Sequence, residues 1–192
     1  MDRRLAIKNI GMLTGGLLFL PACDFSDEKA SIVLNQLQIT EKQENLMKEL
    51  VAAFLPEGEI PGAKSLGVHN FVWIMVEDSM GEEKQNSYVN GLKIFDSRVK
   101  EISGKTFVEL DLSERITILN DLLKSDTEEE KNIDKTEAKD IQDFINTSKY
   151  YAVWGYMQSE YIMTEIMPYK LVPGSYGSCE IIDKNKRINV NG

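Results

Sequence analysis

Few residues of this chain are of the types that carry out catalysis or hold metals. The sequence has one histidine, His69, and two cysteines, Cys23 and Cys179. Zinc sites draw several ligands from histidine and cysteine, so a zinc site rich in nitrogen or sulfur is nearly excluded. Neither a CxxCH haem-attachment motif nor a GxGxxG dinucleotide-binding motif occurs. We therefore expect no catalytic residue, no metal and no cofactor bound by this chain.

The remaining polar candidates also have structural interpretations. His69 falls inside a predicted helix, which favours a packing or surface role over catalysis. Glu77 and Asp78 are adjacent on that helix, so their side chains diverge and cannot share a substrate proton. The acidic run DTEEEKNID at 126–134 lacks the alternating ligands and the central glycine of an EF-hand. We interpret it as a solvated loop.

Aromatic residues gather in the segment YYAVWGYMQSEY, which contains Tyr150, Tyr151, Trp154 and Tyr156. Such rings could stack on a cofactor, but core packing or a docking face for another protein is the favoured interpretation. Gly155, in the same segment, would let a neighbouring helix approach closely. These residues indicate a protein that binds another macromolecule and catalyses nothing.

Helical periodicity organises the part of the chain that positions these residues. Apolar spacing and breaker residues predict helices over 40–55, 65–79, 82–102, 113–123 and 136–167. Thr40 and Gln43 have capping-box spacing at the first helix. Ser113 is expected to cap the fourth helix, after a short extended segment. The residues expected to face inward from that fourth helix are Ile116, Leu119, Leu122 and Leu123.

No stretch shows convincing alternation of apolar and polar residues, and no internal repeat occurs. Pro168 and the following LVPGSYGSC end regular structure. We predict an all-α fold, a small bundle of about five helices with an irregular C-terminal tail.

The first 22 residues differ from the rest and predict a leader. Arg3, Arg4 and Lys8 precede an apolar run at 10–20, which is about half of the roughly 20 residues needed to cross a bilayer. The paired arginines are typical of the twin-arginine signals that export folded proteins. The alternative is an uncleaved, buried N-terminal helix.

Leu20-Pro21-Ala22-Cys23 resembles a bacterial lipobox, in which the cysteine is acylated and becomes the first residue of the mature chain. We expect residues 1–22 to be a lipoprotein signal peptide, 23–38 a flexible acidic tether, and 39–192 a single helical domain. The predicted location is periplasmic and membrane-anchored.

The net charge of the chain is −9, and removing the leader, with three basic residues and one acid, leaves −11. Nucleic acid is therefore an improbable partner, since its binding needs basic patches. Anionic lipid would repel such a chain unless the chain were covalently tethered.

Four segments together resemble the gluconate 2-dehydrogenase subunit 3 family. They are MDRRLAIKNIGMLTGG, IPGAKSLGVHNFVWIMVEDS, GKTFVELDLSERITIL and GYMQSEYIMTEIMPYKLVPGSYGSCE. The resemblance implies a small exported subunit that accompanies an FAD-containing dehydrogenase of the glucose-methanol-choline type, often with a cytochrome c subunit. The flavin and the sugar or sugar-acid chemistry would belong to the large partner. The small subunit would carry the export signal for both chains and support the partner's maturation.

The tail VPGSYGSC is the expected partner interface, together with Trp154. The tail residues concerned are Pro173, Gly174, Tyr176, Gly177 and Cys179. With Cys23 acylated, Cys179 would be the only thiol left in an oxidising compartment. It is either buried as a small apolar residue or disulfide-bonded to the catalytic subunit. The alternative to an accessory subunit is a free-standing structural or interaction lipoprotein with no enzyme partner.

Overall fold

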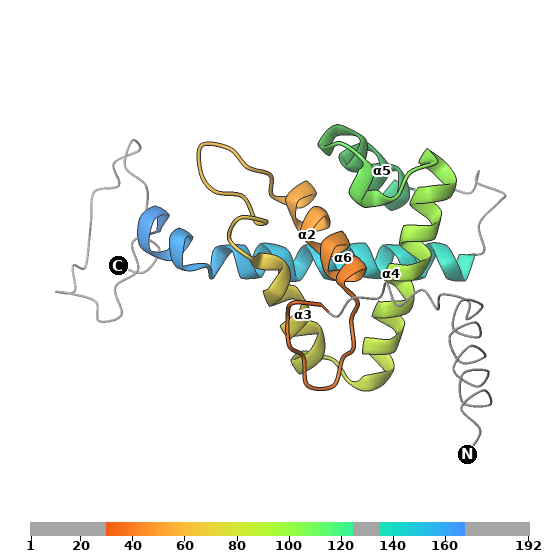
Figure 1. Cartoon of the computed structure of the whole chain (residues 1–192), viewed down its shortest axis with the longest axis horizontal. Coiled ribbons are helices and arrows are strands. Elements are labelled where there is room, and N and C mark those ends of the chain that lie inside the picture. Colours follow the sequence, from red (N-terminus) through yellow and green to blue (C-terminus); the bar gives the residue numbers. More distant parts are fainter. Residues whose placement is uncertain (1–29, 125–134, 168–192) are drawn as a thin grey trace, which may run out of the picture.

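The computed structural model describes residues 30–124 and 135–167, and within them the chain is all-α (Figure 1). The predicted leader, the acidic run 126–134 and the tail from Pro168 lie outside the described residues, as do Arg3, Arg4, Cys23 and Cys179. The helices are α2 (Glu41–Phe54), α3 (Val68–Ser79), α4 (Glu82–Ser103), α5 (Leu112–Lys124) and α6 (Lys135–Met157). A 3-10 turn, η2 (Phe107–Glu109), precedes α5, and a short π-helix, η3 (Ile162–Ile166), follows α6.

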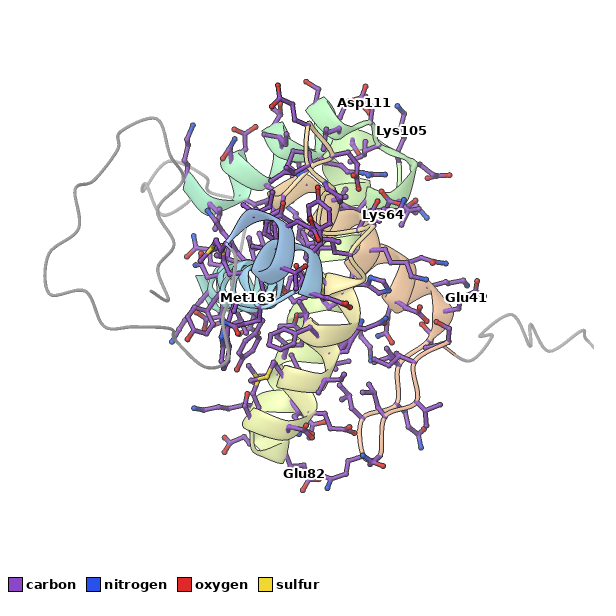
Figure 2. The ribbon with its side chains drawn as sticks, turned by 90° about the vertical axis from the view of Figure 1, so that its left-hand side faces the viewer. Glu41, Lys64, Glu82, Lys105, Asp111 and Met163 are labelled. Carbon is purple, nitrogen blue, oxygen red and sulfur yellow. The ribbon has the colours of Figure 1, made fainter. Side chains whose placement is uncertain are left out.

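Helix α6 runs through the middle of the bundle and contacts α2, α3, α4 and α5 (Figure 1). Seen from its C-terminal end, with Met163 of η3 in view, the start of α5 at Asp111 lies above and the start of α4 at Glu82 lies below (Figure 2). The core between the helices contains large, fully buried side chains. The largest are Trp73, Phe95, Phe107 and Phe144. The predicted all-α bundle is confirmed for the described part of the chain, in which no helix is long and apolar enough to cross a membrane.

The capping box predicted at the first helix is present. The Thr40 hydroxyl accepts from the Gln43 backbone N–H, and the Gln43 side chain accepts from the Thr40 N–H, at 3.3 and 2.9 Å. These two bonds satisfy amides that have no partner within the helix. The helix ends at Phe54, one residue earlier than expected.

The predicted cap of α5 is wrong. Asp111, not Ser113, starts this helix: its carboxylate accepts from the Glu114 N–H at 2.8 Å, and the Glu114 carboxylate accepts from the Asp111 N–H at 2.9 Å. Of the four residues predicted to face inward, Leu119 and Leu122 are buried and Leu123 is partly buried, but Ile116 is exposed and Ile118 is buried in its place. The segment before α5 is the turn η2 and not extended, because Thr106 and Glu109 form a capping box of their own.

Two glycines allow α6 to approach its neighbours. A Cβ on Gly91 of α4 would lie 2.8 Å from the Asp140 carbonyl oxygen and 3.0 Å from the Phe144 Cβ. A Cβ on Gly155 would lie 2.5 Å from the Phe71 Cδ1 of α3. The close approach predicted at Gly155 is therefore present.

The described part of the expected tether does not run free of the bundle. The Ser31 N–H and hydroxyl donate to the Glu44 carboxylate, both at 2.5 Å. The Gln36 and Leu37 N–H groups donate to Glu77 of α3 at 2.6 and 3.0 Å. Apolar side chains of this segment pack against the core, namely Ile32, Leu34, Leu37 and Ile39. Residues 31–38, which were expected to belong to the tether, therefore pack on the bundle through these carboxylates and apolar contacts.

The expected helix over 136–167 is interrupted. Helix α6 ends at Met157, and the chain then turns before η3. The Ser159 hydroxyl donates to the Tyr156 carbonyl at 2.7 Å, which satisfies one carbonyl at the end of the helix.

Candidate docking face on helix α6

Four apolar side chains form an exposed stripe on the C-terminal half of α6. Tyr150, Val153, Trp154 and Met157 are 65, 43, 42 and 39% exposed. Their spacing of i, i+3, i+4 and i+7 places them on one side of the helix. We call this stripe the α6 face. It borders a shallow groove whose remaining lining residues are Asn146 and Lys149.

Ring contacts hold the α6 face in one arrangement. Trp154 packs edge-on against Phe71 of α3, with ring centroids 5.7 Å apart, and Tyr150 lies 6.2 Å from Trp154. Tyr151 stacks beside Trp154 at 6.5 Å, and its hydroxyl is 2.7 Å from the Ser79 hydroxyl. The stripe is therefore supported from α3 while its outer surface stays open.

A hydrogen bond also holds the C-terminal end of α6 in place. The Tyr156 hydroxyl donates to the Pro61 carbonyl at 2.9 Å, which ties the loop between α2 and α3 to α6. Burial is the main cause of a raised pKa for this hydroxyl. The phenol therefore stays protonated and keeps its role as a donor.

The α6 face lies in a segment with almost no charge. Between Asp143 and Glu160, Lys149 is the only charged residue, although 28% of the chain is Asp, Glu, Lys or Arg. Aromatic residues and methionine are enriched, and charges depleted, at the centres of protein–protein interfaces. This composition suits contact with another protein.

Of the predicted interface residues, only Trp154 lies within the described part of the chain, and it is on the α6 face. Pro173, Gly174, Tyr176, Gly177 and Cys179 lie outside it. Among the aromatics singled out from the sequence, Tyr150 shares the face, whereas Tyr151 and Tyr156 are partly buried beneath or beside it. The sequence reasoning missed Val153 and Met157. Their helical spacing from Tyr150 in an uncharged stretch was the available signal.

His69 lies elsewhere and has a structural environment. It is buried on α3, with its Nε2 4.0 Å from the Glu44 Oε1. Burial lowers the pKa of His69, as do nearby Lys48 and Lys64, against the opposing effect of Glu44. The imidazole is thus neutral near pH 7.

Glu44 is a buried carboxylate whose partners keep it charged. Burial raises the pKa of Glu44, but hydrogen bonds from Lys48 and Ser31 outweigh this and lower it to about 2. The Glu77 carboxylate accepts from the backbone N–H groups of Gln36 and Leu37, which gives it a structural role. Over residues 30–124 and 135–167, no group of three or more histidine, cysteine, aspartate or glutamate residues could hold a metal ion.

A helical bundle with an exposed stripe of aromatic and other apolar side chains has the features of a subunit that docks on another protein. The sequence profile of gluconate 2-dehydrogenase subunit 3 matches residues 41–174, which include every helix from α2 to η3. The chain belongs to this family, and it is an accessory subunit of such a dehydrogenase complex. No curated protein and no solved structure matches it.

Proposed function

We propose that this chain is the non-catalytic small subunit of an FAD-dependent dehydrogenase complex of the glucose-methanol-choline type. It binds the FAD-containing catalytic subunit and supports its export, maturation and attachment to the membrane. The observation that supports docking is the α6 face, with Tyr150 and Trp154 exposed in a stretch whose only charged residue is Lys149. Tyrosine and tryptophan are the residues that most often dominate binding energy at interfaces.

The folding of a flavoprotein explains why this chain would carry the export signal and the catalytic subunit the flavin. A flavoprotein folds around its cofactor, so a catalytic subunit loaded with FAD in the cytoplasm must cross the membrane folded. Twin-arginine signals serve folded cargo. Arg3 and Arg4 of this chain would then export both proteins if the catalytic subunit has no leader of its own. A cytochrome c subunit is the further partner proposed for the complex.

Docking is tested with the full chain and an FAD-containing dehydrogenase of the glucose-methanol-choline type from the same organism. Tyr150→Ser combined with Met157→Ser should weaken the complex at least tenfold, since both side chains lose apolar contact with the partner. Ile102→Ser is the matched control, because Ile102 is 52% exposed but lies on α4 and does not line the groove of the α6 face. A wild-type chain that binds no such flavoprotein would favour the alternative, a free-standing structural lipoprotein.

Export is tested separately in cells. Arg3→Lys with Arg4→Lys should leave this chain and the flavoprotein in the cytoplasm. Normal export of both proteins in the double variant would contradict the twin-arginine assignment.

Membrane attachment is assigned to acylation of Cys23, because two or more acyl chains at roughly 0.8 kcal/mol per buried methylene give a stable anchor. Cys23→Ser should release a soluble or unprocessed form. A variant that fractionates with membranes like the parent and is cleaved at the same place would rule out the lipobox.

The tail is proposed to lie on the catalytic subunit, with Cys179 disulfide-bonded to it and Tyr176 packed at the same interface. A non-reducing gel of the complex should then show a band at the summed mass that disappears in Cys179→Ser. Separate bands from the oxidised wild-type complex would exclude the disulfide, and burial of Cys179 would be the remaining interpretation.

A further inference from the structure

A second row of exposed apolar side chains runs along η2 and α5. Val108, Leu112 and Ile116 are 41, 42 and 38% exposed and are spaced four residues apart. We call them the α5 row. Together with the α6 face, this row accounts for seven of the ten large apolar side chains that are exposed in the described part of the chain.

Lys149 joins the two surfaces. It lines the groove of the α6 face, and it also lines a separate groove between the end of α2, α5 and α6. The apolar walls of that second groove include Phe54, Ile116 and Leu123. An apolar surface therefore continues from the α6 face past Lys149 to Ile116 of the α5 row.

The α6 face is smaller than the area that each partner buries in a stable protein–protein interface. The exposed parts of its four side chains amount to roughly 300–400 Å², since an aromatic side chain presents about 150–250 Å² in full. A specific complex buries about 800 Å² on each partner. The missing area has to come from neighbouring surface, and the apolar groove beside Lys149 is adjacent to the face.

The charge at the junction indicates what the partner presents. Lys149 is exposed and forms no ion pair with any other side chain that the structure describes. Apolar side chains line both grooves beside Lys149, so its ammonium group would lose most of its water when a partner binds there. Such a group needs a carboxylate opposite it, because burying an unpaired charge is costly.

We propose that the catalytic subunit binds across both surfaces, with an apolar contact on the α5 row at Ile116 and a carboxylate that pairs with Lys149. This rests on the proposed function, which supplies the partner. Lys149 then determines specificity: a partner with the same apolar shape but no acidic group at this place would leave the lysine buried and unpaired.

The proposal is tested by measuring the affinity of the full chain for the purified catalytic subunit. Ile116→Ser should weaken binding at least tenfold, and Lys149→Glu at least thirtyfold, because the latter places like charges together. Lys149→Met keeps the apolar stem, so its loss should be smaller and its affinity should depend less on salt. Ile102→Ser should bind like the parent, and thermal unfolding of each variant confirms that it is folded.

The outcomes separate this proposal from the one on which it rests. Parental affinity in both Ile116→Ser and Lys149→Glu, with weak binding in Tyr150→Ser/Met157→Ser, would confine the interface to α6 and overturn the proposal alone. A wild-type chain that fails to bind the catalytic subunit would overturn both. Concentration-dependent self-association that Ile116→Ser abolishes, without any effect on the catalytic subunit, would assign the α5 row to a second copy of this chain.

Discussion

The two sides of α6 differ in what covers them. On the inner side, Ile141, Phe144, Ile145 and Ala152 are at most 2% exposed and pack against the other helices. On the outer side of the C-terminal half, the α6 face leaves 39–65% of each side chain in water. Both sides of the helix are apolar, but only the inner side packs in the core of this chain.

A helix that is apolar on all sides is normally buried on all sides. In α6 the second apolar side therefore indicates a surface kept for something other than the core of this chain, since contiguous exposed apolar patches mark interaction sites. The comparison also separates two functions of the residues: the inner side determines stability, and the outer side determines binding.

The largest effect is expected on the inner side. Phe144→Ala should lower the free energy of unfolding by about 3–5 kcal/mol, because it removes a ring that is 1% exposed and leaves a cavity. Phe144 also contacts Tyr88 and Phe95, at ring distances of 5.1 and 5.4 Å, so its loss affects two helices. Chemical denaturation measures the change. A loss below about 1 kcal/mol would show that the inner side does not determine stability.

A smaller loss is expected where α4 crosses α6. Gly91→Ala should cost about 1–3 kcal/mol, since its Cβ would lie 2.8 Å from a backbone oxygen of α6 and the two helices would have to separate. Gly81→Ala is the matched control, because a Cβ there meets nothing within 4 Å and its φ is −70°. Equal unfolding midpoints for the two variants would contradict the close crossing.

Acid should destabilise the protein in two steps. The pKa of His69 is lowered in the fold, so its contribution is present above the unfolded value of 6.5 and is lost as pH falls below it. The pKa of Glu44 is lowered from 4.5 to about 2, so its contribution is lost between those values. His69→Gln should flatten the fall in melting temperature between pH 7 and 5 and leave the fall below pH 4.5.

The sequence predicted features that depend on nearby residues. The capping box at Thr40 involves residues three apart, and the close contact at Gly155 needs only a small residue on a helix that packs. The same local signal is present at Asp111 and Glu114, which are also three residues apart, although Ser113 was the predicted cap. The burial of Ile118 in place of Ile116 depends on how α5 packs against α2 and α6, which the cap does not determine.

Features that depend on distant residues could not be predicted in this way. Ser31 and Glu44 meet across 13 residues of sequence, and Leu37 meets Glu77 across 40. Nothing in a single sequence distinguishes these carboxylates from solvated ones. Similarly, the aromatics of α6 were recognisable, but which of them face outward depends on where α3 and α4 pack. That is determined by the tertiary structure and not by the composition of the helix.

The smallest loss of stability, with a large loss of binding, is expected on the outer side. Tyr150→Ser with Met157→Ser should change the free energy of unfolding by less than about 1 kcal/mol, because substitutions at exposed positions rarely cost more. The same variant should bind the catalytic subunit at least tenfold more weakly. A single variant would then lose binding while keeping its stability. Denaturation and affinity are measured on the same preparation, with Phe144→Ala as the opposite case. If the outer variant unfolds as readily as Phe144→Ala, the stripe belongs to the core of this chain, and its role as a surface for a partner is wrong.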